Sequence, residues 1–131
     1  MKIGFDAKRA FYNGSGLGNY ARNLLRSLAV YHPEDKYHLF SPSLSGSLFN
    51  DSLEESTPFI KHTPKGLNKT FSSFWRSVGI TQDLNMLGLD IFHGLSNELP
   101  YSINQFKGKK IWCEKPLVET TKQSDEIYDL M

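Results

Sequence analysis

The chain has 131 residues and a formal net charge of +1, and 39% of its residues are hydrophobic. This length fits one domain with a substantial core and is too short for two Rossmann-type domains. The composition excludes disorder, collagen-like repeats and low complexity, and the near-neutral charge argues against a nucleic-acid-binding protein. The single cysteine, Cys113, excludes an internal disulfide framework and a multi-cysteine metal site, and it favours a reducing compartment.

The apolar runs are too short for a bilayer-spanning helix, and the start of the chain lacks the long apolar region of a signal peptide. Export is therefore not expected. Basic residues concentrate in residues 1–33, which hold five Lys or Arg side chains against one Asp. This segment suits an anionic small ligand, and solvated surface charges are the alternative explanation.

The predicted elements begin with an apolar strand at residues 2–5 and a polar loop over 6–15. The clearest helix follows and ends at His32-Pro33. Arg22 and Arg26 are expected on the face opposite its apolar stripe. That stripe has helical spacing and consists of Leu17, Tyr20, Ala21, Leu24, Leu25 and Leu28.

The rest of the chain predicts four more short strands, at residues 37–40, 59–62, 90–93 and 110–113. A Ser-rich mobile loop is expected over 41–57. A second amphipathic helix is expected to start near Thr70, with four core-facing side chains: Phe71, Phe74, Trp75 and Val78. A capping-box pattern, Thr120 followed by Gln123, opens a last predicted helix.

This alternation of strands and helices predicts an α/β fold. We expect a Rossmann-like, mostly parallel sheet with helices on both faces. Ligands of such sheets bind beyond the carboxyl ends of the strands. Residues 6–20, 93–98 and 113–116 are therefore the expected functional segments.

The first of these segments is rich in glycine and reads Gly14-Ser15-Gly16-Leu17-Gly18. Small residues let backbone N–H groups approach an anion, and the start of a helix adds partial positive charge, so phosphate or diphosphate suits it. The G-x-G-x-G spacing and the long preceding loop differ from the dinucleotide fingerprint. A plain flexible loop that leads into a helix is the alternative.

The second segment contains His93 at a strand end, followed by Asn97 and Glu98. A histidine there can donate to a phosphate or hydroxyl, and the two polar residues can bind sugar hydroxyls. A satisfied buried histidine and a solvated loop are the alternatives. The other histidines, at positions 32, 38 and 62, lack ligand spacing, so no metal site is predicted.

Two stretches resemble the N-terminal domain of bacterial group 1 glycosyltransferases, which are retaining enzymes of the GT-B fold. The stretches are residues 3–20, from Ile3-Gly4-Phe5-Asp6 to the glycine segment, and residues 90–100, which read DIFHGLSNELP. The resemblance covers about residues 1–106 and implies a single half of a GT-B fold. It implies that residues 14–18 face the donor diphosphate and that His93 is catalytic. The implied residues for a saccharide or lipid-linked acceptor are Asn19, Tyr20, Asn97 and Glu98.

The same resemblance implies that the nucleotide-sugar is the only co-substrate and that no metal or further cofactor is needed. It implies a cytoplasmic protein with peripheral contact to the inner face of the membrane. The nucleotide-binding second domain of such enzymes is missing from this chain. We therefore expect little or no sugar transfer by the chain alone.

Residues 107–131 resemble a different family, the Gfo/Idh/MocA-type NAD(P)-dependent oxidoreductases. The similar run is GKKIWCEKPL, and the resemblance implies that Lys115 is catalytic and contacts NAD(P) and substrate. Group 1 glycosyltransferases usually have a His-Asp pair at this strand end, which Trp112-Cys113-Glu114 replaces here.

The two resemblances conflict, because the oxidoreductases need a compact glycine turn directly after the first strand. We predict a mosaic in which a glycosyltransferase domain, residues 1–106, has its sheet completed by a strand and helix from residues 107–131. A fragment of an NAD(P)-dependent oxidoreductase and a non-catalytic anion-binding domain are the alternative functions.

Overall fold

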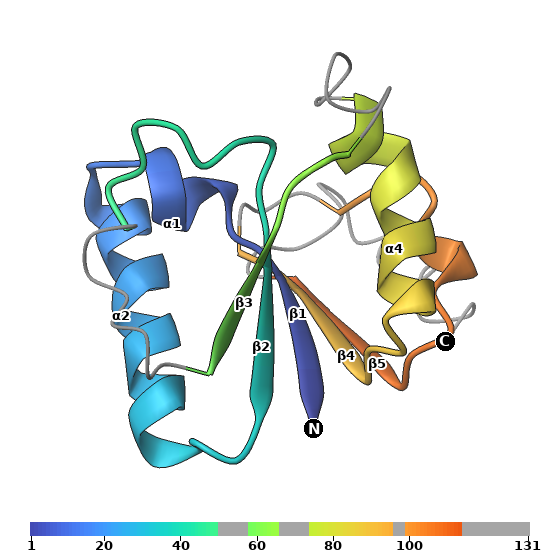
Figure 1. The fold of residues 1–131 in the computed structure, drawn as a ribbon, viewed down its shortest axis with the longest axis horizontal. Helices are drawn as coiled ribbons and strands as arrows, with labels where there is room; N and C mark the ends of the chain where they lie inside the picture. Colours follow the sequence, from blue (N-terminus) through green and yellow to red (C-terminus); the bar gives the residue numbers. More distant parts are fainter. Residues whose placement is uncertain (50–57, 66–73, 96–98, 114–131) are drawn as a thin grey trace, which may run out of the picture.

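The computed structural model describes residues 1–49, 58–65, 74–95 and 99–113. These residues form a five-stranded sheet in the order β3-β2-β1-β4-β5, and all of its strand pairs are parallel. Helices cover the sheet from both sides (Figure 1). The prediction of a Rossmann-like α/β fold is thus confirmed.

The strands lie within one or two residues of their predicted positions. β1 is the central strand, and its residue Phe5 pairs with Leu39 of β2 on one side and with His93 of β4 on the other. β5 pairs with β4, so the strand of the predicted tail belongs to the same sheet as the preceding residues. The strand bounds are β1 Lys2–Asp6, β2 Lys36–Phe40, β3 Phe59–His62, β4 Ile91–Gly94 and β5 Lys110–Cys113.

One face of the sheet is covered by α1, Lys8–Tyr12, and α2, Gly16–Tyr31. The predicted stripe of α2 holds in its middle, where Ala21 and Leu25 are fully buried. It fails at the start, where Leu17 is 43% exposed and Tyr20 is 50% exposed. The first turns of α2 instead turn Gly18 and Arg22 inward, because this part of the helix packs on the α1 segment and not on the sheet.

The predicted loop over 6–15 is wrong for residues 8–12, which form α1. Five residues are too few to show a helical period in the sequence, yet Ala10 and Phe11 are fully buried under α2. The prediction that Arg22 lies on the outer face of α2 is also wrong, because Arg22 is buried. Its guanidinium donates to the carbonyls of Ala10 and Asn13, both at 2.9 Å, where the short helix ends. These contacts satisfy carbonyls that a helix terminus leaves without intrahelical partners.

The other face carries a π-helical turn, η3 (Trp75–Gly79), which continues into α4 (Ile80–Met86), and a 3-10 turn, η4 (Ile103–Gln105). These elements bury a second core with Phe40 and Phe92 of the sheet. Of the predicted core-facing side chains in the described part of this helix, only Trp75 is buried, whereas Phe74 and Val78 are exposed. The wider π turn shifts the helical register, so the 3.6-residue spacing misplaces its neighbours.

Three predictions fall partly or wholly outside the described residues: the start of this helix near Thr70, the Ser-rich loop beyond Phe49, and the last helix from Thr120. The described part of the loop, residues 41–49, contains no helix or strand, as predicted. Its last residue, Phe49, is nevertheless fully buried and packs edge-on against Phe11. This part of the loop therefore contributes to the core over α1.

His38 of β2 and His62 of β3 form a pair on the face that carries α4. His38 Nδ1 lies 2.8 Å from His62 Nε2, and the two rings stack with centroids 5.1 Å apart. His38 is buried, and within the described residues its Nε2 atom has no hydrogen-bond partner. Burial, together with the adjacent His62, lowers the pKa of His38 from its usual 6.5 to about 4. The pair is therefore neutral at pH 7.

We expect the protein to lose stability as the pH falls from 6.5 toward 4. The unfolded chain protonates His38 near pH 6.5, whereas the folded chain resists this down to about pH 4. Urea denaturation should show a free energy of unfolding about 1–2 kcal/mol lower at pH 5 than at pH 7. The variant His38→Gln should show a smaller loss between these pH values, and an undiminished loss would contradict this assignment.

Candidate functional site at the carboxyl edge of the sheet

The strand order creates a switch point between β1 and β4. From β1 the chain proceeds outward to β2 and β3, and it then returns to β4 on the other side of β1. Ligands of open α/β sheets bind in the crevice at such a point, outside the carboxyl ends of the strands. Because Phe5 and His93 are paired in register, the segments that follow β1 and β4 leave the sheet next to each other.

The glycine segment lies at this edge, at the start of α2 (Figure 1). The helix begins at Gly16, and the side chain of the N-cap residue Ser15 makes no hydrogen bond to it. Ser15 is instead bonded to the preceding loop, because its backbone N–H donates to Asn13 Oδ1 at 2.8 Å. Gly14, Ser15, Gly16 and Leu17 are exposed, so uncapped N–H groups of the first turn are accessible from solvent.

Gly16 and Gly18 have different roles. A Cβ atom at Gly18 would lie 1.7 Å from the carbonyl oxygen of Asn13, so the approach of α2 to the end of α1 requires glycine there. A Cβ atom at Gly16 would meet no heavy atom within 4 Å. Packing therefore accounts for Gly18, whereas Gly16 borders open space.

We expect the substitution Gly18→Ala to lower the free energy of unfolding by about 1–3 kcal/mol, because the added methyl group overlaps Asn13. The matched substitution Gly16→Ala should leave stability unchanged or raise it by up to about 1 kcal/mol, because alanine favours the helix. Urea denaturation of both variants measures this difference. Equal stability of the two variants would contradict the assigned packing role.

The predicted acceptor residues are only partly described. Asn19 accepts a hydrogen bond at its Oδ1 atom from Arg22 at 2.6 Å, and Tyr20 is half exposed. Asn97 and Glu98 lie outside the described residues, as does Lys115. Of the predicted acceptor set, therefore, Asn19 and Tyr20 stand next to the glycine segment on α2.

His93 lies on the sheet face that carries α1 and α2, the same face as the glycine segment. Its ring contacts the ring of Phe5, with centroids 5.4 Å apart, and meets the Trp112 ring edge-on at 6.2 Å. The histidine is half-buried at the end of β4. Aromatic packing against Phe5 and Trp112 therefore fixes the position of the His93 ring at the end of β4.

Sequence reasoning missed a buried ion pair at the centre of the edge. Arg76 Nη2 lies 2.6 Å from Asp6 Oδ2, and Arg76 Nε donates to the same carboxylate at 3.1 and 3.3 Å. Asp6 Oδ1 also accepts the backbone N–H of Lys8 at 3.3 Å. Asp6 ends β1 and Arg76 belongs to η3, so the pair joins the central strand to the helix on the α4 face. The sequence did contain one signal for this pair, because Asp6 is an acidic residue directly after a run that predicts a buried strand.

Removing one partner of this pair should be strongly destabilising, because it leaves a buried charge without compensation. We expect Asp6→Asn and Arg76→Leu each to lower the free energy of unfolding by about 3–5 kcal/mol. The double variant Asp6→Leu/Arg76→Leu should lose less than the sum of the single changes, as measured by urea denaturation in a double-mutant cycle. Strict additivity would show that the two residues are not coupled.

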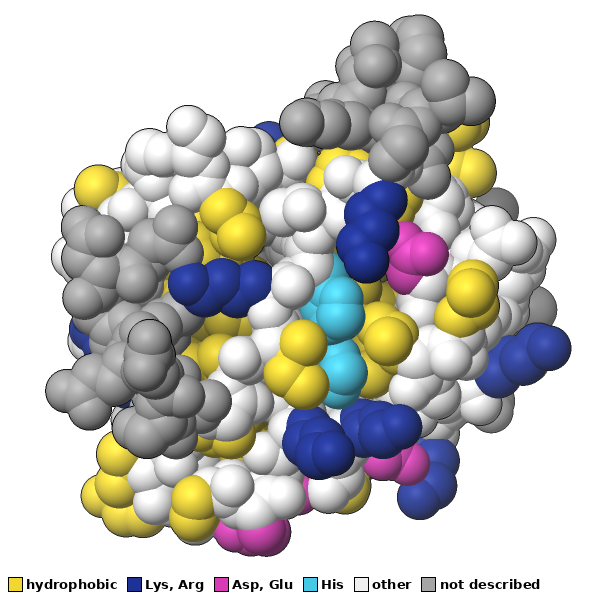
Figure 2. Space-filling model, in the orientation of Figure 1, with side chains coloured by type: hydrophobic (Ala, Val, Ile, Leu, Met, Phe, Trp, Pro, Cys, Tyr) yellow, Lys and Arg dark blue, Asp and Glu magenta, His cyan; other side chains and the backbone are white. Residues whose placement is uncertain are grey.

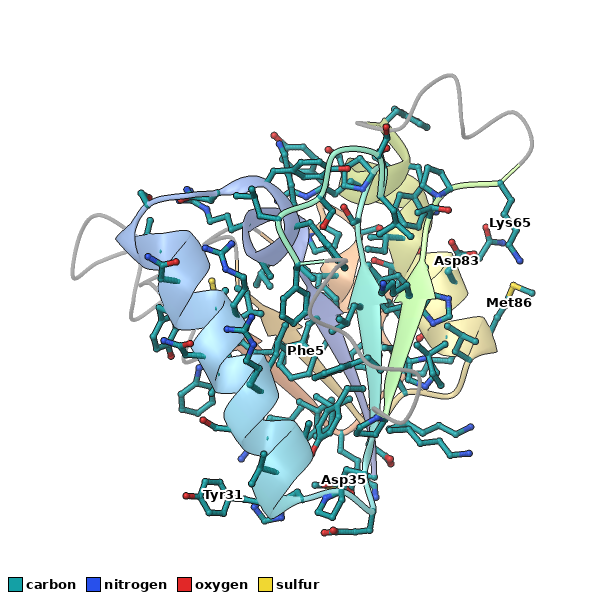
Figure 3. All side chains as sticks on the ribbon, turned by 60° about the vertical axis from the view of Figure 1, so that its left-hand side comes forward. Phe5, Tyr31, Asp35, Lys65, Asp83 and Met86 are labelled. Atoms are coloured by element: carbon teal, nitrogen blue, oxygen red, sulfur yellow. The ribbon has the colours of Figure 1, made fainter. Side chains whose placement is uncertain are left out.

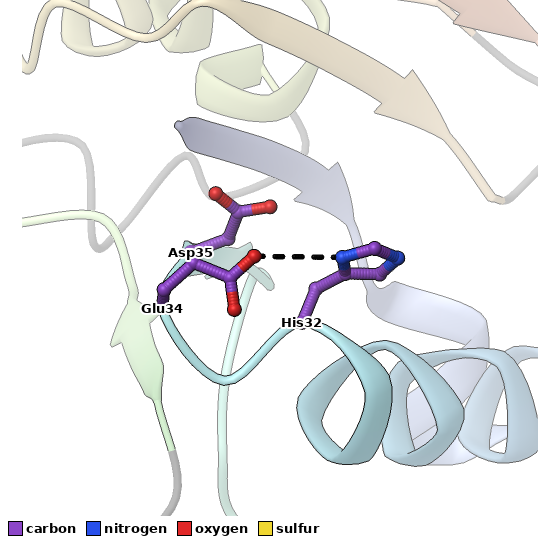
Figure 4. Close-up of side chains that lie close together, drawn as sticks. All are labelled: His32, Glu34 and Asp35. Carbon is purple, nitrogen blue, oxygen red and sulfur yellow. Dashed lines mark ion pairs between the residues drawn. The ribbon is translucent and has the colours of Figure 1, made fainter.

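A second cluster of polar groups lies at the opposite, amino edge of the sheet. His32, Glu34 and Asp35 bring their ligand atoms within 4.8 Å of one another, and His32 Nδ1 is 3.5 Å from Glu34 Oε1 (Figure 4). Asp35 also forms an ion pair with the terminal ammonium group of Met1. His32 and Glu34 are exposed, and the pairing with Met1 accounts for Asp35 without a metal ion.

Comparisons of this chain with protein-family models, with curated proteins and with solved structures found no match. In the described part of the chain, no helix combines the length and hydropathy needed to cross a membrane. The structure also separates β1 from α2 by α1, so the compact turn of the dinucleotide fingerprint is not formed between Asp6 and Gly16. The carboxyl edge of the sheet thus carries an exposed helix start, a half-buried histidine and the ion pair of Asp6 and Arg76.

Proposed function

We propose that this chain is the acceptor-side domain of a retaining glycosyltransferase, which moves a sugar from a nucleotide-sugar to a saccharide or lipid-linked acceptor. The support is the resemblance of two separate stretches, residues 3–20 and 90–100, together with a fold of the kind that this resemblance implies. A second, nucleotide-binding domain would complete the enzyme.

The observation that carries the proposal is the pairing of Phe5 with His93. The two stretches are far apart in the sequence, yet this pairing places the ends of β1 and β4 side by side at the switch point of the sheet, where ligands of open α/β sheets bind. Their coincidence there is expected if they serve one ligand site.

In this proposal, the first turn of α2 receives the donor diphosphate. The N–H groups of residues 16–18 supply hydrogen bonds, and the helix dipole supplies partial positive charge, which together stabilise the departing anion without a metal ion. Gly14 and Ser15 let the diphosphate approach the backbone. His93 acts next to the transferred sugar as a hydrogen-bond donor, and Asn19 and Tyr20 contact the acceptor with Asn97 and Glu98.

A peripheral contact with membrane lipid is part of the same proposal. Four exposed hydrophobic side chains belong to the segments around the start of α2: Tyr12, Leu17, Tyr20 and Leu48. Lys8, which is exposed, and Arg9 on α1 add positive charge nearby. A hydrophobic surface with basic neighbours suits a membrane that contains anionic lipid, where a lipid-linked acceptor would reside.

The diphosphate site is tested by titrating the ¹⁵N-labelled chain with UDP, GDP and ADP. We expect saturable amide shifts at Gly16, Leu17 and Gly18, and no shift at Gly88, which lies at the opposite edge of the sheet. Gly16→Asp should weaken binding at least about tenfold, because its carboxylate repels the anion. The protein should stay folded, because the new side chain enters open space.

The neutral variant Gly16→Ala is the matched control and should bind the diphosphates as the parent chain does. Equal affinity of Gly16→Asp and Gly16→Ala would contradict the proposed site. NADH is the discriminating ligand for the oxidoreductase alternative. Binding of NADH that persists in Gly16→Asp, without diphosphate binding at α2, would favour that alternative.

A further inference from the structure

A cavity of about 310 Å³ lies between the carboxyl ends of β2 and β3 and the helix α4. The rings of Phe40, His62 and Trp75 line it, together with Leu87. Its charged residues are Lys65 and Asp83. Figure 3 shows Lys65, Asp83 and Met86 on the same side of the molecule. On the face shown in Figure 2, histidine side chains likewise lie next to basic, acidic and hydrophobic side chains.

Aromatic side chains form the floor of the cavity. Phe40 stacks on His62 with ring centroids 4.7 Å apart, and Phe40 meets Trp75 at 6.4 Å. Phe40 and Trp75 are almost fully buried and form the floor behind the cavity, so its accessible apolar surface comes mainly from Met86 and Leu87. A volume of this size is at the lower limit for ligand pockets, which favours a monomeric ligand.

The cavity also offers one fixed negative and one positive charge. Trp75 Nε1 donates to Asp83 Oδ2 at 2.6 Å, which holds the carboxylate in place. Among the described residues, Asp83 and Lys65 form no ion pair with each other or with another side chain. Burial lowers the pKa of His62, so this ring adds no charge at neutral pH.

We propose that this cavity binds a free α-amino acid with an apolar side chain. The ammonium group pairs with Asp83, the carboxylate pairs with Lys65, and the side chain contacts Met86 and Leu87. A zwitterion complements both charges at once, and its apolar part packs on Met86 and Leu87. An apolar ligand alone would leave both charges without partners, and an anion alone would face the Asp83 carboxylate. This inference is independent of the proposed glycosyl transfer.

Tryptophan fluorescence of the full chain tests the proposal. The chain has two tryptophans, and Trp112→Phe removes the exposed one, so Trp75 in the cavity wall becomes the sole reporter. We expect L-leucine and L-methionine to change its emission with saturation. N-acetyl-L-leucine, which lacks the ammonium group, and L-leucine amide, which lacks the carboxylate, should bind at least about tenfold more weakly.

Side-chain variants in the same background separate recognition from folding. Asp83→Asn keeps an oxygen for the Trp75 hydrogen bond and should weaken leucine binding at least about tenfold, as should Lys65→Met. Lys107→Met, which removes an exposed lysine outside the cavity, should bind as the parent does. Absence of a saturable change, or equal binding of leucine and N-acetyl-L-leucine, would overturn the proposal.

Discussion

The structure depends on the central strand β1, whose backbone is bonded on both sides. β2 and β4 pair with it in parallel, so every loop that follows a strand leaves the same edge of the sheet. This constraint places Asp6, the start of α2 and His93 at the same edge of the sheet. It also requires cover on both faces, since strands bonded on both sides in a parallel sheet are buried above and below. The two cores around Phe5 and Phe92 meet that requirement.

Charged and polar side chains join the helices to this frame where apolar contacts end. Arg22 binds the carbonyls at the end of α1, and Arg76 binds Asp6 at the end of β1. Both guanidiniums sit near the carboxyl edge, where the chain leaves regular structure and exposes backbone groups. A buried arginine is stable in such a place because it can bond several oxygens at once. Of these contacts, those of Arg22 join the start of α2 to the end of α1.

The strand that resembles the oxidoreductases and the strands that resemble the glycosyltransferases form one sheet over the described residues. Lys110–Cys113 pairs with β4 in regular parallel register, although its sequence resembles a different family from the strands before it. A parallel edge accepts such a strand because backbone hydrogen bonds, which are independent of side-chain identity, form the pairing. Ile111 on the α4 face is 41% exposed and Trp112 on the other face is 56% exposed, so both faces of this edge strand are only partly covered.

The sequence by itself determined the five strands, the helix α2 and the α/β class, because buried strands and a long amphipathic helix leave periodic patterns of apolar residues. It also indicated that the glycine segment and His93 follow strands. Only the tertiary structure decided which face of α2 is buried, that residues 8–12 form a helix, that the π turn leaves Phe74 outside, and that Arg76 pairs with Asp6. These features arise from contacts between residues far apart in the chain, so no local period records them. A hydrophobic pattern repeats along a short stretch of sequence and can be recognised there. The position of a buried charge depends on one specific partner, which for Asp6 is a residue far away in the chain.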